Sequence, residues 1–347
     1  MTDAAVYDFS TRARAAGLAD DGLCRHGGDA LAERALADSL DGPVVCPLVD
    51  VAVLRATGAD AATFLNNLLT NDITHLPAGT VRLAGLCTPK GRLSALFHVL
   101  RDPAANDDFL LLLPAEIAAP VLKKLSMYVL RSKVKLADVT ADYLPLGIAA
   151  RDASALGAVS PRLCFESTPI IALNRSTPPA LGISLLPANA AVPDDLVRVG
   201  LAAWRGLEIA AGLPRVVAAT QEAFVPQMLN LELLAMNGVN FRKGCYPGQE
   251  IVARTQYLGK VKRRTYRAAL AAMVAPGDAV FGPETGDQPC GAIVSVAPSA
   301  TGCDVLVCAQ SAAVEAGDAR VGAPDGPVLQ IGTLPYALDG PDTRAEA

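Results

Sequence analysis

Short apolar runs, interrupted by Gly- and Pro-containing turns, recur along the whole chain and predict a protein that mixes strands with helices. Residues 44–54 are rich in β-branched side chains, which predicts a strand pair or one long strand. The next segment has apolar residues at i, i+4 spacing from Phe64 to Leu69, which predicts a helix with Asp60 as its N-cap. Further strands are expected over 81–87, 93–100 and 108–113, and further helices over 115–129, 194–211 and 224–236.

The C-terminal part, from Arg264 onward, alternates short apolar runs with Gly/Pro turns, a rhythm typical of a small β-barrel or sandwich. Residues 161–193 are rich in Pro, Ser and Ala and are expected to form edge strands and loops of a second lobe. The first forty residues are expected to wrap the surface and the last eleven to form a frayed tail. Together these patterns predict an α+β protein.

The composition narrows the functional classes. Of 347 residues, 51% are hydrophobic and 19% are charged, which is enough apolar surface to bury a core and excludes wholesale disorder. A formal charge of −5 and a pI near 5.3 argue against a protein that binds polyanions over its whole surface. No run of about 20 apolar residues could span a bilayer, and no signal peptide is visible at the N-terminus, so we expect a cytoplasmic protein.

The cysteines and histidines do not predict a metal site. Eight cysteines are scattered without a Cys-x-x-Cys pair, and only three histidines accompany them. In a cytoplasmic chain of this size the thiols are expected to stay reduced. We therefore expect no stably bound metal.

The segment from Lys243 to Glu250, Lys-Gly-Cys-Tyr-Pro-Gly-Gln-Glu, differs from its surroundings. Pro247 and Gly248 suit positions i+1 and i+2 of a type II turn, which would hold Cys245 at a bend. Neighbouring Lys and Arg side chains would lower the pKa of the thiol and make the sulfur a better nucleophile or metal ligand. The alternative interpretation is a small buried cysteine in a turn beside a solvated basic surface.

This segment, followed by Val252-Ala-Arg254, resembles the signature of the YgfZ-type folate-binding proteins, relatives of the folate-dependent glycine cleavage T-protein. Other blocks resemble the family in the same order and extend the similarity over roughly residues 44 to 267. These blocks are Thr57-Gly-Ala-Asp-x3-Phe64-Leu, Thr70-Asn-Asp72, Cys87-Thr-Pro-Lys-Gly-Arg92 and Phe224-Val-Pro-Gln-x-Leu-Asn-Leu231.

The resemblance implies a three-lobed fold, with mixed α/β lobes around a central folate-sized opening and a C-terminal β-barrel. The corresponding division is a surface segment over 1–40, a folate-binding region over 41–262, a barrel over 263–336 and a tail over 337–347. It also implies an accessory protein that binds tetrahydrofolate or a derivative and supports the assembly or repair of iron–sulfur clusters in selected enzymes, including transfer-RNA-modifying ones. The partners implied are a reduced folate and iron–sulfur enzymes or assembly proteins.

The family's functional residues are carried over by position. Cys245 and Lys243 fall on the motif positions expected to be catalytic. Trp204 falls on a tryptophan assigned to folate contact, and an indole face can stack on a flat pteridine ring. The alternative for Trp204 is a helix residue packed in the core. The other residues expected to contact the folate are Arg254, Gln249 and Asn71.

Three positions depart from the family pattern. A second folate-contacting tryptophan of some members falls at Val51, and the pteridine-binding glutamate of the T-protein falls at Ala210. The catalytic aspartate of the T-protein would lie in the strand that holds Ser94 and Ala95, where no carboxylate is present. Acid–base help for aminomethyl transfer therefore has no evident source, and a one-carbon transferase is kept only as the alternative function.

Two segments are basic although the chain as a whole carries a net negative charge. Residues 123–135 hold five Lys or Arg and no acid, and residues 242–267 hold eight against the single Glu250. An anionic partner, either a folate polyglutamate tail or a nucleic acid, would explain such a segment, whereas an ordinary solvated surface is the simpler explanation for 123–135. For 242–267 the coincidence with Cys245 favours a small anionic cofactor, and we expect neither stable nucleic-acid binding nor membrane association. A third function, an RNA-associated module without folate, is the weakest.

Overall fold

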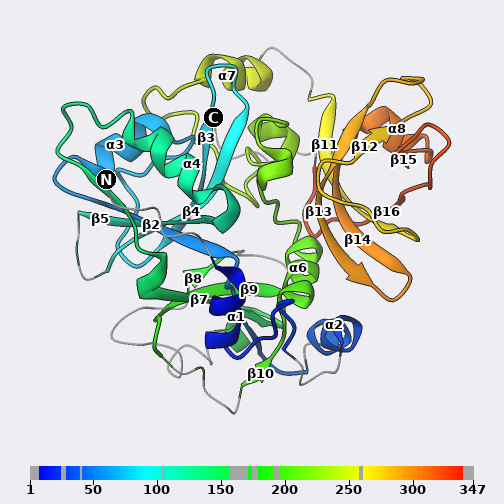
Figure 1. The fold of residues 1–347 in the computed structure, drawn as a ribbon. Coiled ribbons are helices and arrows are strands. Elements are labelled where there is room, and N and C mark those ends of the chain that lie inside the picture. Colours follow the sequence, from blue (N-terminus) through cyan, green and yellow to red (C-terminus); the bar gives the residue numbers. More distant parts are fainter. Residues whose placement is uncertain are drawn as a thin grey trace.

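Three antiparallel-rich sheets, linked by helices, make up the protein (Figure 1). The computed structural model describes residues 8–24, 29–39, 41–103, 105, 107–156, 171–173, 179–190, 192, 196–257 and 261–338. Two of the sheets lie side by side, and the third stands beyond helix α6 (Leu201–Ala210). The α+β prediction, with three lobes, is confirmed.

The first sheet has the strand order β10-β1-β7-β9-β8 and is antiparallel except for the β1–β10 pair. Its strands are β1 (Val44–Pro47), β7 (Tyr143–Ala150), β8 (Ile171–Ala172), β9 (Ala180–Pro187) and β10 (Val197–Arg198). The helix α1 (Phe9–Ala15) packs on it through Ala13, which lies in one core cluster with Val45 and Ile148. The N-terminal segment therefore contributes to a core as well as covering the surface.

The second sheet has the order β3-β4-β5-β2-β6 and carries two helices on one face. Its strands are β2 (Val51–Thr57), β3 (Val81–Cys87), β4 (Leu93–Arg101), β5 (Asp108–Pro114) and β6 (Lys135–Asp138). Helices α3 (Ala61–Leu68) and α4 (Ala115–Ser126) bury Phe64, Leu65 and Val121 in the same core cluster as Phe97 and Leu111 of the sheet. The opposite face joins the central core of the molecule.

The third sheet has the order β15-β12-β13-β14-β11-β16 and curls almost into a barrel. Its elements are β11 (Arg263–Leu270), β12 (Ala279–Phe281), β13 (Gly291–Ser299), β14 (Gly302–Gln310), α8 (Ser311–Glu315), β15 (Arg320–Val321) and β16 (Gln330–Gly332). The bridge between Arg320 and Val328 brings the chain that enters β16 beside β15, so the two edges approach each other. This agrees with the barrel expected from the sequence.

Helix α6 connects the sheets through a partly buried ion-pair network. Arg205 donates hydrogen bonds of 2.5 Å to both Asp50 and Glu208, and Arg215 lies 3.2 Å from Asp50. Asp50 lies in the linker where the chain passes from β1 in the first sheet to β2 in the second. Because each carboxylate has an arginine partner, burial of these charges is compensated, and the linker is fixed to α6.

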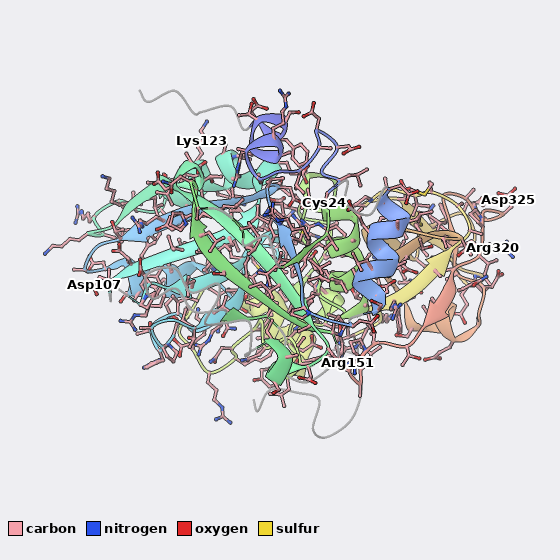
Figure 2. The ribbon with its side chains drawn as sticks, turned by 90° about the horizontal axis from the view of Figure 1, so that it is seen from below. Cys24, Asp107, Lys123, Arg151, Arg320 and Asp325 are labelled. Carbon is pink, nitrogen blue, oxygen red and sulfur yellow. The ribbon has the colours of Figure 1, made fainter. Side chains whose placement is uncertain are left out.

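Helix α2 (Ala30–Ser39) covers the junction between α6 and the third sheet, as Figure 2 shows from below. Arg34 of α2 pairs with Asp38 and, at 2.8 Å, with Asp304 of β14. On another side of the sheet, buried Arg264 of β11 pairs at 2.7 Å with Glu232, which is 1% exposed. Charged pairs thus attach the third sheet to the rest of the chain.

The predicted strands lie where the apolar pattern placed them, but several helices differ. The helix expected over 194–211 begins only at Leu201, because β10 precedes it. Instead of the helix expected over 224–236, the chain forms only the short 3-10 turn η3 (Pro226–Leu229). Elsewhere the chain has two similar 3-10 turns, η1 (Thr140–Asp142) and η2 (Ala218–Thr220). Within 161–193, β8 is an edge strand as predicted, whereas β9 is flanked by β7 and β8 and so is not one. Much of that stretch and most of the 337–347 tail lie outside the described residues.

Asp60 precedes α3 as predicted, but its carboxylate does not cap that helix. It accepts a 2.7 Å hydrogen bond from the backbone N–H of Lys133 instead. The side chain therefore fixes the segment after α4 to the start of α3.

We predict that Arg264→Met destabilises the protein by about 3–5 kcal/mol, because it leaves the buried Glu232 carboxylate without its ion-pair partner. Urea unfolding of the variant measures the loss. The double variant Arg264→Met/Glu232→Leu, which removes both charges, should lose less than the single variant. A single variant within about 1 kcal/mol of wild type would contradict a role of this pair in attaching the third sheet.

Candidate functional site

Residues 246–249 form the turn that the sequence predicts. The backbone N–H of Gln249 donates to the carbonyl of Tyr246 at 3.1 Å, and Gly248 has φ +81°. A left-handed residue at the third position defines a type II turn, and glycine adopts that conformation without steric penalty. Helix α7 (Gln249–Tyr257) begins directly after the turn, so Cys245 precedes a regular element and is not part of one.

A second glycine turn, over residues 88–92 between β3 and β4, packs directly against the first. A Cβ on Gly248 would lie 2.3 Å from the carbonyl oxygen of Thr88 and 2.7 Å from Cα of Gly91. Gly91 is itself left-handed, at φ +71°, and a Cβ there would lie 3.0 Å from Cβ of Ile251 in α7. Since neither position has room for a side chain, the two motifs meet backbone to backbone.

Lys243 attaches the turn to the end of α3. Its ammonium donates to the carbonyl of Leu69 at 2.9 Å and also to the carbonyl of Asn66. It lies 4.6 Å from the centre of the Tyr246 ring, within range of a cation–π contact. Cations suit a helix C-terminus, where carbonyls lack partners and the helix dipole is negative. The structure thus gives Lys243 a structural contact that the sequence did not reveal.

Burial lowers the pKa of the Lys243 ammonium from its usual value near 10.5 to about 8. Asp72 and Cys245 act in the opposite direction, because a negative charge nearby favours the protonated amine. Cys245 therefore lies close enough to Lys243 to act on the charge of this amine.

Cys245 is exposed, whereas the other six cysteines that the structure describes are buried. Beside it, a Cβ on Gly244 would have no heavy atom within 4 Å, so the backbone next to the thiol borders open space. The alternative of a buried structural cysteine is therefore wrong for this position. In the described part of the chain, no group of three or more His, Cys, Asp or Glu side chains could hold a metal ion.

Gln249 and Arg254 lie on α7, the helix that follows Cys245 in the sequence. Gln249 is the first residue of the helix and is half-buried, and Arg254 is exposed in its last turn. Arg242, which precedes the motif, is exposed as well. Their contact with a folate stays a prediction.

Asn71 is used within the protein. Its side-chain N–H₂ donates to the carbonyls of Leu83 (2.9 Å) and Asn237 (2.5 Å), and its oxygen accepts from the backbone N–H of Asp72 at 2.8 Å. The residue is 2% exposed. Asn71 thus joins β3 to the segment that leads into the cysteine motif. Both N–H groups of its side chain are used in these contacts, so neither is available to donate to a ligand.

Trp204 lies in the central core and is 0% exposed. Its indole N–H donates to Glu208 at 3.1 Å, and a Cβ on Gly147 of β7 would come within 2.8 Å of the ring. The indole has no exposed face on which a pteridine could stack, so its contact with folate stays a prediction and its evident role is packing. Burial raises the pKa of the Glu208 carboxyl, whereas Arg205 and the hydrogen bond from the Trp204 indole N–H act to lower it.

One group of residues that the sequence did not single out surrounds Ser94. The hydroxyl of Ser94 contacts Glu222 and Lys124, which come from distant parts of the chain. The strand itself holds no carboxylate, as expected, but Glu222 provides one from another segment. Sequence reasoning could not find it, since it examined only the strand itself.

The basic segment 123–135 is exposed at Lys123, Arg131, Lys133 and Lys135. A shallow depression beside it is lined by residues of α3 and of the chain after α4, among them Phe64 and Tyr128. Nothing in the described residues connects this depression to Cys245. Within the same described part, no helix has the length and apolar character needed to cross a membrane.

Comparisons with known proteins agree on one family. Residues 46–159 match the family model described as the GCVT N-terminal domain. An uncharacterized protein of Haemophilus influenzae is 31% identical over 221 residues, which cover 63% of this chain and 71% of that protein. The tRNA-modifying protein YgfZ of Edwardsiella ictaluri is 32% identical over 239 residues, covering 63% of this chain and 69% of its own length.

Among solved structures, the glycine cleavage system aminomethyltransferase T of Bartonella henselae is similar with a TM-score of 0.66. The match covers 89% of this chain and 90% of that chain at 16% sequence identity. The shared fold is therefore that of the T-protein, as the resemblance implied.

We predict that Gly248→Ala destabilises the protein by more than about 2 kcal/mol, because the added methyl group meets the Thr88 carbonyl and the left-handed backbone is strained. The matched control is Gly244→Ala, whose methyl group enters open space and should change stability by less than about 0.5 kcal/mol. Chemical unfolding of both variants measures the difference. Equal stabilities would show that the two turns are not interlocked.

A second prediction concerns Lys243 and pH. Because its pKa is lower in the folded protein (about 8) than in the unfolded chain (near 10.5), the unfolded chain binds this proton more tightly. The charged amine therefore weakens the fold below pH 8, and that penalty disappears as the pH rises from about 8 to 10.5. Relative to a Lys243→Gln variant, wild type should gain stability over that window in thermal unfolding. A constant difference between the two proteins would contradict the burial of this amine.

Proposed function

The chain belongs to the YgfZ family, and we propose that it binds a reduced folate and supports the assembly or repair of iron–sulfur clusters in selected enzymes through Cys245. The enzymes served would include ones that modify transfer RNA, in keeping with the name of its relatives. In this proposal the protein is an accessory factor, and the folate is its cofactor.

The observation that carries the proposal is that an exposed thiol lies directly before a tightly packed turn. Among the described cysteines only Cys245 is exposed. Its segment is held in place by the close contact of Gly248 with Gly91 and by the hydrogen bond from Lys243 to the carbonyl of Leu69. A purely structural cysteine gains nothing from exposure, whereas a thiol that must reach a partner needs it. Exposed Arg242 and Arg254, on either side of the motif in the sequence, add positive charge that suits an anionic ligand.

Support for a folate comes from the fold and from the accessible residues near the thiol. The T-protein fold is shared over most of the chain, and the family model that matches is that of the T-protein N-terminal domain. Gln249 and Arg254 are the predicted contacts that a ligand could reach as they lie, and Arg254 suits the carboxylates of a folate tail. Trp204 and Asn71 would have to change their present contacts to take part.

The alternative, a folate-dependent aminomethyltransferase, would need a carboxylate that acts on the folate. Detectable aminomethyl transfer from a lipoyl carrier protein would favour it over the accessory role. Glu222 is the residue to substitute first in such an assay, since its carboxylate contacts Ser94.

We predict that Cys245→Ser folds normally but fails to restore iron–sulfur enzyme activity in cells that lack the protein. The side chain is exposed, so its unfolding free energy should stay within about 0.5 kcal/mol of wild type. Wild type expressed to the same level should restore the activity. Cys303→Ala, which removes a buried thiol of the third sheet, is the matched control and should restore it too.

Full restoration by Cys245→Ser would show that the thiol assignment is wrong. Calorimetry tests the folate separately: tetrahydrofolate should bind wild type, and no binding would overturn the folate part of the proposal.

A further inference from the structure

Ser94 is the extra residue of a β-bulge at the start of β4. Leu93 pairs with Cys87 and Ala95 pairs with Leu86, so Ser94 has no partner across the ladder. As a result Leu93 faces the central core and Ala95 the core beneath the helices α3 and α4. Bulges re-aim side chains and are frequent beside functional sites. At the bulge, the Ser94 hydroxyl contacts Lys124 and Glu222.

The Ser94 hydroxyl lies between an ammonium and a carboxylate. Lys124 of α4 donates to it at 2.7 Å, and the hydroxyl donates to Oε1 of Glu222 at 3.1 Å. Lys124 also lies 3.5 Å from the same carboxylate oxygen. Ser94 itself is 2% exposed, so this small network has a buried centre.

Glu222 is held in a backbone conformation that favours glycine. Its φ is +60°, which costs a non-glycine residue on the order of 1 kcal/mol. Its N–H donates to the carbonyl of Leu93 at 2.7 Å, and Arg92 donates to the carbonyls of Glu222 and Ala223. On the other side, Gln221 donates to the backbone carbonyl of Ser94 at 2.7 Å. The surroundings therefore enforce a strain that a glycine would not have, which indicates a use for the side chain.

Half of the Glu222 carboxylate is left open. The side chain is 54% exposed, and its Oε1 is the oxygen held by Ser94 and Lys124. In the part of the chain that the structure describes, Oε2 has no hydrogen-bond partner. Because Ser94 and Lys124 hold Oε1, the carboxylate presents Oε2 in a fixed orientation, free to accept a hydrogen bond from a ligand.

The open carboxylate and Cys245 flank the same turn, residues 88–92. Gly91 packs against Gly248 on one side, and Arg92 binds the carbonyl of Ala223 on the other. The buried Cys87, at the base of the turn, lies near both Lys124 and Tyr246.

We propose that Glu222, positioned by Ser94 and Lys124, accepts hydrogen bonds from the N–H groups of a ligand bound against the 88–92 turn. This inference rests on the proposed function: for a reduced folate, the N–H-bearing pterin head binds Glu222. A carboxylate pairs with N–H donors and repels the carboxylates of the folate tail, so the tail points away from it, toward basic residues such as Arg254.

The test is calorimetric titration of wild type, Glu222→Gln and Glu222→Gly with two probes. Tetrahydrofolate carries the pterin head, whereas p-aminobenzoyl-glutamate is the tail alone. Both substitutions should weaken tetrahydrofolate binding about tenfold or more, because a charge-assisted hydrogen bond is lost. Binding of the tail fragment should stay unchanged. Glu222→Gly should unfold at the same or a higher temperature than wild type, since glycine relieves the strain at φ +60°.

The control is Glu284→Gln, which neutralises an exposed carboxylate in the turn between β12 and β13 and should leave both titrations unchanged. If wild type binds tetrahydrofolate and both Glu222 variants bind it equally well, the inference is wrong and the proposed function stands. Equal weakening of both probes would also overturn it, because Glu222 would then act through the structure and not on the head. Absence of tetrahydrofolate binding by wild type would overturn the proposed function itself.

Discussion

The contact between two left-handed glycines, Gly91 and Gly248, is the constraint on which the site depends. It joins residues that are 157 positions apart, because each turn fills the space that a side chain on the other would need. Backbone-to-backbone contact of this kind leaves little freedom to slide, so the position of the cysteine motif relative to β3 and β4 is fixed. Without it, the exposed thiol would lie at the end of an ordinary loop.

The interactions around this contact extend the same constraint to the rest of the site. Lys243 joins the motif to the end of α3, and Gln227 of η3 donates to the carbonyl of Val252 in α7 at 2.7 Å. The segment before η3 is in turn held at the bulge through Glu222 and Leu93. The Cys245 thiol and the open Glu222 carboxylate are therefore connected by one set of contacts, which fixes their positions relative to each other.

Local signals predicted the fold and part of the site. Pro247 and Gly248 predicted the type II turn because their backbone preferences are intrinsic, and alternating apolar residues predicted the strands for the same reason. The burial of Trp204 could not be read from a helix that is apolar on most sides. Lys243 looked like a solvated cation, since nothing near it in sequence shows that the end of α3 would lie beneath it. Glu222 was missed because neither a bulge nor a positive φ at a non-glycine residue has a sequence signature, and its partners are more than 90 positions away.

Hydrogen exchange of the backbone with and without tetrahydrofolate tests the central claim most directly, namely that the interlocked turns form a folate site beside Cys245. Bound ligand should slow exchange in three separate segments together: residues 88–93, 220–224 and 244–252. The third sheet, which contributes no residue to the proposed site, should exchange at an unchanged rate. Protection confined to another region, or no protection in the presence of saturating tetrahydrofolate, would contradict the account.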